Sequence, residues 1–270
     1  MNTLIVTLSD THSGSTTALF PNRFWQGEHN NHTPTEKQKR IWKHFEYCAK
    51  LIKQKRKGKK LIVVHDGDAL EGVHNGSLQV ITRVKNEQVG IHADLMDYFL
   101  SAVEFTKRTD KLYYTLGTEV HTDDNEELCA ADLGAEENPE GGHVFNLLEL
   151  TINKRLLWFT HHGPTSGKGA NQGNAFRNFL RDIFFDTIKA GDTPPDFVVT
   201  GHVHDPLYQV FIQNYKDAYH VTHGIINPSW QMKTRYAYKV APVAKNKIGL
   251  SLFEITDVGD IRPPLIPVMI

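Results

Sequence analysis

The 270-residue sequence predicts a layered α/β fold with a largely parallel core. Short apolar runs rich in β-branched residues alternate with longer amphipathic stretches, which is typical of strands that alternate with helices. The apolar runs repeatedly end in Asp, His or Gly, so polar side chains are expected to collect at one edge of the sheet. No internal repeat, low-complexity linker or convincing boundary divides the chain, so residues 1–270 are expected to form a single domain.

Three strands and two helices are expected in the N-terminal half. Each strand is a short apolar run, and each helix shows apolar residues at helical spacing. The basic run 53–60 closes the first helix, where cations complement the helix dipole. The Gly-, Ser- and Asn-rich residues 13–34 are expected to form a long functional loop. The expected strands span residues 4–8, 61–64 and 112–116, and the expected helices span residues 35–57 and 87–108.

The C-terminal half is expected to be richer in strands. It begins with a polar, acidic stretch that runs to residue 142. Two strands joined at Asn153-Lys154, a helix and a further strand follow, and the chain is β-rich to about residue 255. The apolar residues 263–270 are expected to pack on their own sheet or on a neighbouring subunit, which leaves the oligomeric state open. The two joined strands span residues 147–160, the helix spans 172–190 and the further strand spans 197–200.

The composition argues against several classes of protein. A formal net charge of −1 argues against binding nucleic acid by bulk charge, although a local basic groove remains open. Cys48 and Cys129 form no CxxC, which argues against a disulfide framework or a thiolate zinc site, whereas fifteen histidines offer imidazole ligands. The N-terminus lacks the features of a signal peptide, and no apolar run is long enough to span a membrane. The expected location is the cytoplasm, with no membrane partner.

Six residues of the types that bind metals follow the expected strands in order along the chain. Asp10 and His12 lie two residues apart just after the first strand, so both side chains can converge on one cation. Asp68 follows the second strand, and its two carboxylate oxygens can bridge two ions. Two divalent ions about 3.5–4 Å apart would clamp a phosphoryl group and turn a shared water into a nucleophile near neutral pH. The remaining ligands are neutral imidazoles, supplied by His161, His202 and His204.

This order of motifs resembles that of the calcineurin-like metallophosphoesterase family, whose pattern is DxH, GD, GNH, H and GHxH. The resemblance covers about residues 4–206, and the sequence is similar in style to phage-encoded members, which would place it in the host cytoplasm. It implies a four-layer α-β-β-α sandwich and two divalent metal ions, with Mn²⁺ favoured and Mg, Fe, Zn and Ni as alternatives. It also implies that Asp68 bridges the ions, that Asp10, His12, Asp68 and His204 hold the first, and that His161 and His202 hold the second.

The third motif departs from the family pattern. Where the family has Gly-Asn-His, residues 117–121 read Gly-Thr-Glu-Val-His. In the family the Asn binds the second metal and the adjacent His is the general acid. Glu119 is expected to replace the Asn, because a carboxylate suits Mn²⁺ or Mg²⁺ better than the hydroxyl of Thr118. His121 is then expected to protonate the leaving-group oxygen. The alternatives are a weakened second metal site and a loop in which neither residue takes part.

Three residues that flank Asp68 are expected to orient the ligands: His65, Asp66 and Glu71.

The position of Glu71 also argues against one subtype of metal site. Purple acid phosphatases have a Tyr three residues after the bridging Asp, and here that position is occupied by Glu71. An iron–tyrosinate site is therefore disfavoured.

The glycine-rich loop 163–173 is the first candidate for substrate binding. Its backbone amides and Lys168 can contact a phosphate, although the loop lacks the P-loop pattern and is equally consistent with a flexible connection. Arg177 lies on the helix that follows, on a face that can track a phosphate backbone. Arginines in such a position are more often simply solvated.

Aromatic and cationic residues alternate from Trp230 through Lys233 and Arg235 to Tyr236 and Tyr238. This mixture suits base stacking combined with phosphate contact, so Trp230 and Lys233 are expected to bind substrate, but an ordinary amphipathic strand has the same pattern. The acidic region that precedes this segment argues against a broad nucleic-acid-binding surface. A duplex lying over residues 119–153, which carry many acids and no Lys or Arg, would be repelled.

The leading functional hypothesis is hydrolysis of a phosphodiester, with DNA or RNA among the candidate substrates. Phosphomonoesters and small nucleotides come second. A non-catalytic scaffold is a separate class, supported only by the altered third motif. A β-lactamase-like metallohydrolase fits poorly: His202, His204 and Asp205 match the start of HxHxDH, but Pro206 and Leu207 occupy its final positions.

Overall fold

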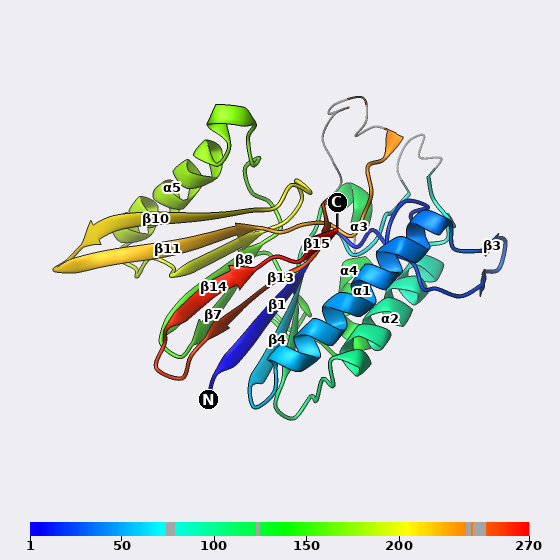
Figure 1. Ribbon diagram of the computed structural model, residues 1–270, viewed down its shortest axis with the longest axis horizontal. Coiled ribbons are helices and arrows are strands. Elements are labelled where there is room, and N and C mark those ends of the chain that lie inside the picture. The colour runs from blue at the N-terminus through cyan, green and yellow to red at the C-terminus, as the bar shows by residue number, and fades with distance from the viewer. Residues whose placement is uncertain (74–78, 123–124, 236–238, 240–246, 270) are drawn as a thin grey trace.

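The protein is a mixed α/β structure built around two sheets (Figure 1). The computed structural model describes residues 1–73, 79–122, 125–235, 239 and 247–269. The larger sheet consists, in spatial order, of β14 (Ile261–Leu265), β13 (Ser251–Ile255), β1 (Thr3–Leu8), β4 (Lys60–Asp66), β5 (Lys111–Thr115) and β6 (Val144–Phe145). The smaller sheet consists of β10 (Leu207–Tyr215), β11 (Ala218–Ile226), β9 (Phe197–Thr200), β8 (Arg155–Thr160) and β7 (Leu148–Ile152).

The strands that lead to the predicted site residues pair mainly in parallel, as the alternation of strands and helices in the sequence predicts. Strands β1, β4, β5 and β6 run parallel, as do β8, β9 and β11, whereas the other pairs in these two sheets are antiparallel. Two small sheets pair β2 (Trp25–Gln26) with β3 (Asn31–His32) and β12 (Ile248–Gly249) with β15 (Val268–Met269). The helices whose bounds fall within the described residues are α1 (Glu36–Lys55), α2 (Lys85–Ala102), α3 (Glu119–Thr122), α4 (Asn125–Leu133) and α5 (Asn174–Ala190), with a 3₁₀ turn at Gly169–Asn171.

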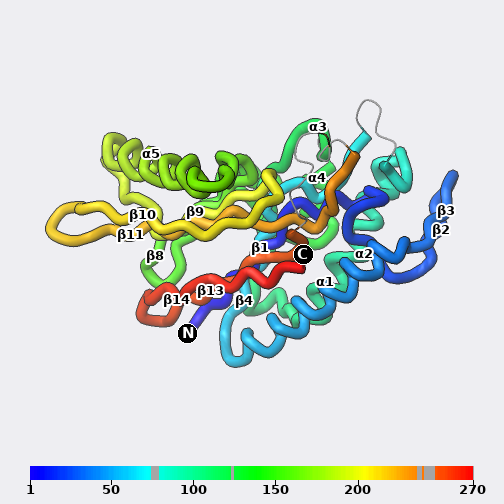
Figure 2. Tube along the Cα trace, turned by 45° about the horizontal axis from the view of Figure 1, so that its top comes forward, coloured from blue at the N-terminus to red at the C-terminus, as the bar shows by residue number. Residues whose placement is uncertain are grey.

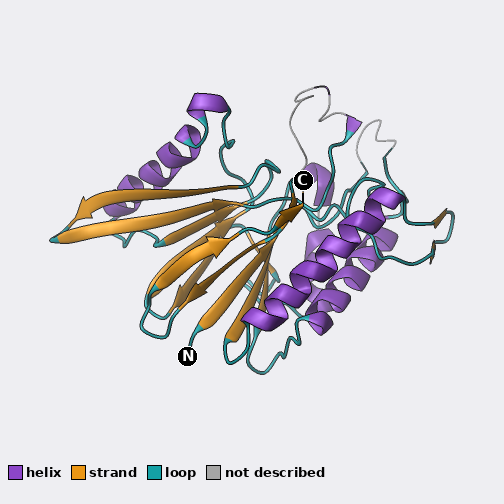
Figure 3. Cartoon of the chain, viewed as in Figure 1, coloured by secondary structure: helices purple, strands orange, loops and turns teal. Residues whose placement is uncertain are grey.

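Side chains that alternate along the strands build a core on each face of each sheet. In β1, Val6 packs with residues of α1, α2 and α4, whereas its neighbour Ile5 packs against the smaller sheet. In β9, Val199 faces that same inter-sheet core and Val198 faces α5. The helices therefore lie on the outer faces of the two sheets, as Figure 3 and the turned view in Figure 2 show.

The first helix begins where its sequence predicts. The Thr35 hydroxyl accepts a hydrogen bond from the Gln38 backbone, and the Gln38 side chain accepts one from the Thr35 backbone, which forms a capping box. Lys53 and Lys55 occupy the last turn, as expected from the basic run. Among the described residues, no helix is both long enough and apolar enough to cross a membrane.

The second helix ends at Ala102, six residues before the expected end at residue 108. Glu104 adopts a left-handed φ of 56°, which cannot continue a helix. The Arg56 guanidinium donates to the carbonyls of Val103 (2.9 Å) and Glu104 (2.7 Å), and so stabilises the turn that follows. A contact distant in sequence therefore sets this boundary.

The acidic stretch and the C-terminal residues both form regular structure. The acidic stretch contains the helices α3 and α4, which were not predicted. The apolar C-terminal residues pack on their own chain, because β14 pairs with β13 and β15 pairs with β12. The predicted aromatic contacts of Tyr236 and Tyr238 lie outside the described residues.

Replacing Phe197 with Ala is expected to lower the free energy of unfolding by about 3–5 kcal/mol. Phe197 is fully buried, and its ring stacks on that of Phe253 from the other sheet, with centroids 3.9 Å apart. Urea denaturation of the variant measures the change. Phe185→Ala is the control, because that ring is 41% exposed and its loss is expected to change stability by less than about 0.5 kcal/mol. Equal effects of the two substitutions would contradict the assignment of the inter-sheet core.

Candidate metal centre

Strand ends from both sheets deliver the residues of the predicted metal site. Asp10 follows β1 and Asp68 follows β4 in the larger sheet. His161 follows β8, and His202 follows β9, in the smaller sheet. Parallel strands end at the same edge of a sheet, so these side chains meet at one end of the inter-sheet core.

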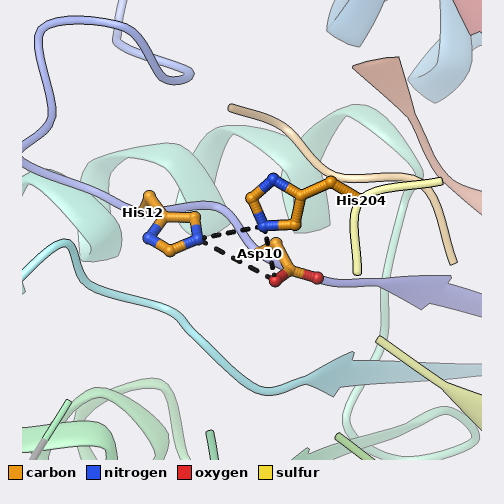
Figure 4. Close-up of side chains that lie close together, drawn as sticks. All are labelled: Asp10, His12 and His204. Carbon is orange, nitrogen blue, oxygen red and sulfur yellow. Dashed lines mark hydrogen bonds and ion pairs between the residues drawn. The ribbon is translucent and has the colours of Figure 1, made fainter. Parts of the chain in front are cut away.

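Three overlapping groups of side chains have ligand atoms within 4.8 Å of one another. In the first group, Asp10 Oδ1 lies 2.9 Å from His204 Nε2 and 3.8 Å from His12 Nε2 (Figure 4). In the third group, Asp68 Oδ2 lies 3.1 Å from His161 Nε2. The middle group shares His12 with the first and Asp68 with the third, so the groups form one continuous cluster. They are Asp10–His12–His204, His12–Asp68–His121 and Asp68–His161–His202.

Five cluster residues have a left-handed backbone, which is unfavourable for residues other than glycine by about 1–3 kcal/mol each. Such a conformation persists only where neighbouring structure enforces it. Here the Asp10 amide donates to Gly67 O and the His12 amide donates to Asp68 O, each at 3.0 Å, so the loops after β1 and β4 are held together. The φ angles are 54° at Asp10, 43° at His12, 53° at Asp68, 69° at His202 and 54° at His204.

Three histidines of the cluster are oriented by acceptors behind them. His161 Nδ1 donates to the Asp66 carbonyl at 2.7 Å, and His121 Nδ1 donates to the Glu71 carbonyl at 2.9 Å. His12 Nδ1 lies 3.3 Å from the Glu71 carboxylate. A carbonyl can only accept, so the Nδ1 atoms of His161 and His121 carry hydrogen, and the lone pair of each neutral ring lies on Nε2. Asp66 and Glu71 therefore lie where orienting residues were expected.

The third motif places Thr118, rather than Glu119, at the cluster. The Thr118 amide donates to Asp68 Oδ1 at 2.6 Å, and its hydroxyl lies 3.3 Å from both Asp68 Oδ2 and His202 Nδ1. This approach requires Gly117, because a Cβ there would lie 2.3 Å from the Asp68 amide nitrogen. Glu119 starts α3, is exposed and belongs to none of the groups found among the described residues. The structure therefore does not place Glu119 among the grouped ligand atoms, and Thr118, one residue earlier, contacts the cluster instead.

A buried carboxylate that the sequence analysis missed joins two loops of the site. Glu126 Oε1 accepts from the Ala69 amide at 3.1 Å, and Oε2 accepts from the Gly117 amide at 2.6 Å. Burial, with a further contribution from the charge of Asp68, raises the pKa of Glu126 to about 7. The signal that could have identified it is the helical spacing of buried positions within residues 126–133.

A buried polar network supports the loop after β1. The Thr11 hydroxyl lies 3.0 Å from His65 Nε2, and the Ser13 hydroxyl lies 3.2 Å from His92 Nδ1. His92 Nε2 in turn lies 2.8 Å from the Tyr114 hydroxyl. Burial lowers the pKa of His92 to about 3, so its ring is neutral and fixes the loop by hydrogen bonding. His65 was expected to orient the ligands directly. It instead contacts the hydroxyl of Thr11, the residue between Asp10 and His12.

Two buried carboxylates dominate the electrostatics of the cluster. Burial alone would raise the pKa of Asp10, but His204 and His161 hold it well below its usual value. His161 has the same effect on the pKa of Asp68. Burial would lower the pKa of His161, yet Asp10 and Asp68 raise it well above its usual value. Within the described part of the chain, the ion pairs of both carboxylates are made with histidines rather than with lysine or arginine.

The residues present fit a divalent cation. Carboxylate oxygen and imidazole nitrogen together suit Mn²⁺, Fe²⁺ and Zn²⁺. The Nε2 atom of His161 is buried and makes no well-aligned hydrogen bond, although it lies 3.1 Å from Asp68 Oδ2. A cation bound between these two atoms would satisfy both of them.

The four expected substrate-binding residues differ in how accessible they are. Trp230 is fully buried and packs edge-on against Phe45, with ring centroids 5.0 Å apart. The expectation that it stacks on a base is wrong, because the core covers its indole. Lys168 and Arg177 are exposed and Lys233 is half-buried, and their contact with substrate stays a prediction.

Comparisons with known proteins leave the family undecided. No family model and no curated protein matches the sequence. Among solved structures, Vps29 from Entamoeba histolytica complexed with Zn²⁺ is 12% identical, with a TM-score of 0.39 and coverage of 97% of this chain and 98% of that chain. Protein TM1076 from Thermotoga maritima is 12% identical, with a TM-score of 0.37 and coverage of 99% of both chains. Likenesses this distant carry no weight for the function of the site.

Replacing Glu126 with Ala is expected to weaken metal binding by about 10- to 100-fold, because the loops that carry Asp68 and Thr118 lose their common acceptor. Isothermal titration calorimetry with Mn²⁺ measures the affinity of the protein for the metal. Glu127→Ala is the matched control, because that carboxylate accepts instead from the amides of His143 and Val144. An affinity unchanged in Glu126→Ala would show that the link does not position the site.

Metal binding is expected to release a proton and to strengthen with pH. The raised pKa of His161 means that the metal-free ring is protonated at neutral pH, and a ligand imidazole must be neutral. Displacing one proton raises the apparent affinity by up to about 10-fold per pH unit between pH 6 and 8. Calorimetry in buffers of different ionisation enthalpy counts the protons. An affinity that does not vary with pH would mean that His161 is not a ligand.

Proposed function

We propose that this chain is a calcineurin-like metallophosphoesterase that hydrolyses phosphodiesters at a dinuclear metal site. The observation that carries the proposal is the position of the Asp68 carboxylate between two groups of ligands. Its Oδ2 atom lies 3.1 Å from His161 Nε2 and 3.9 Å from His12 Nε2. Helices on the outer faces of two packed sheets are compatible with one four-layer α-β-β-α domain over residues 1–270.

The ligands divide between two positions that share Asp68. Asp10, His12 and His204 belong to the first position, and His161 and His202 belong to the second. The Thr118 hydroxyl is a further oxygen beside His202, in place of the family Asn. Two divalent ions, with Mn²⁺ favoured, would activate water near neutral pH and neutralise charge on the phosphoryl oxygens.

His121 is suited to proton transfer at the leaving group. It is half-buried, its ring centroid lies 4.8 Å from that of His12, and its Nδ1–H is committed to Glu71 O. Hydrolysis forms a bond from a water oxygen to phosphorus and breaks the bond to the ester oxygen, so water loses one proton and the leaving oxygen gains one. Burial and the charge of His12 lower the pKa of His121, which makes its protonated ring a stronger acid than a free imidazolium. In this protonated form, the Nε2–H of His121 supplies the second of these protons.

The test is metal-dependent hydrolysis of bis(p-nitrophenyl) phosphate by the purified protein, compared with p-nitrophenyl phosphate. Turnover of the diester with Mn²⁺ and little turnover of the monoester are expected. Asp68→Asn is expected to lower activity on every ester roughly 1000-fold, because both ligand groups lose a shared oxygen. Asp186→Asn, an exposed change on α5, is the control. No turnover of either ester with any divalent cation would overturn the proposal in favour of a non-catalytic scaffold.

The same assay tests the role of His121. His121→Ala is expected to slow hydrolysis of diphenyl phosphate about 100-fold, because phenolate leaves poorly without a proton. The loss on bis(p-nitrophenyl) phosphate is expected to be less than about 10-fold, because p-nitrophenolate needs little protonation. Equal losses on the two esters would show that His121 acts in another way.

A further inference from the structure

A hollow of about 410 Å³ opens beside the third group of ligands. Thr118 links it to the cluster, because the Thr118 hydroxyl lies 3.3 Å from His202 Nδ1. His162 forms a second link, with its ring centroid 4.9 Å from that of His202. A phosphate held at the cluster would therefore direct one of its ester substituents into this hollow. Its lining residues are Leu116, Gly117, Thr118, Glu119, Asn146, Thr160 and His162.

The lining combines one apolar side chain with hydrogen-bonding groups. Leu116 offers an apolar contact surface and is 37% exposed. Glu119 offers a carboxylate that accepts hydrogen bonds, and Asn146 offers an amide that both donates and accepts. A hollow of this size and mixed lining suits a small organic group.

The charge around the hollow disfavours a polyanion. The described lining residues include no lysine or arginine, and Glu119 is the one carboxylate among them. The segment that supplies Glu119 and Asn146, residues 119–153, also contains no lysine or arginine. Binding of a nucleic-acid strand depends on cations that neutralise the phosphates flanking the one being cleaved. Here a flanking phosphate in the hollow would meet the Glu119 carboxylate instead.

We propose that the hollow binds an uncharged, hydroxyl- or amide-bearing substituent of a small phosphodiester, of the size of one nucleoside, and that Glu119 and Asn146 select it. This inference rests on the proposed function and gives Glu119 a role in specificity instead of metal binding. Donor groups such as a ribose diol or a base N–H pair with the carboxylate of Glu119, and the amide of Asn146 adds a second polar contact. A polynucleotide is a poor substrate because its next phosphate is repelled.

The test compares three substrates with Mn²⁺ present: thymidine 5′-(p-nitrophenyl phosphate), bis(p-nitrophenyl) phosphate and a single-stranded oligonucleotide. The wild-type protein is expected to show kcat/KM for the thymidine ester at least about 10-fold above that for the bis ester, and lowest for the oligonucleotide. Glu119→Gln keeps the shape and removes the charge. This substitution is expected to lower the ratio of kcat/KM for the thymidine ester to kcat/KM for bis(p-nitrophenyl) phosphate by about 10-fold. It is also expected to raise kcat/KM for the oligonucleotide.

Two variants complete the design. Asn146→Ala is expected to lower the same ratio, and Glu149→Gln, an exposed change in β7 outside the hollow, is expected to leave it unchanged. If the wild-type protein prefers the oligonucleotide, or if Glu119→Gln leaves the ratio unchanged, the inference is overturned while hydrolysis of the bis ester still supports the phosphoesterase. No hydrolysis of the bis ester overturns the proposed function itself.

Discussion

The buried negative charge of Asp10 and Asp68 is the constraint on which the site depends. These residues are 0% and 1% exposed, and a buried charge is strongly unfavourable unless partners neutralise it. These partners are histidines: His161 Nε2 lies 4.0 Å from Asp10 Oδ1 and 3.1 Å from Asp68 Oδ2, and the two carboxylates raise the pKa of His161 to about 10. A divalent cation would neutralise the same two charges more fully than an imidazolium does. Two carboxylates buried this close together therefore favour the binding of a cation.

The surrounding backbone holds these charges in place at a conformational cost. Left-handed angles at Asp10, His12 and Asp68 would relax in an isolated loop. The loops after β1 and β4 prevent this by hydrogen-bonding to each other, and Glu126 links the second of them to Gly117. The geometry of the cluster is thus a property of three loops together, and each is anchored to a parallel strand of the larger sheet.

The acidic stretch illustrates how one composition serves different structural roles. Glu126 is buried and joins two loops, Glu127 accepts from the amides of His143 and Val144 at the start of β6, and Glu119 is exposed and lines the hollow. Sequence alone presents them as similar acids in a polar region. Which of them is buried depends on the start of α3 and the packing of α4 against α2, and neither follows from local pattern.

The sequence by itself determined the strands that lead to the cluster and the order of the candidate ligands that follow them, because apolar runs and their polar ends are local features. It placed Asp10, Asp68 and His161 at strand ends, where the structure has them. Only the tertiary structure decided that Thr118 approaches the cluster, because this depends on how closely two loops pass. It also decided that Trp230 is covered by the core, since burial depends on contacts distant in sequence. Residue type and spacing limit which side chains can bind a metal, whereas backbone direction and packing determine which of them reach it.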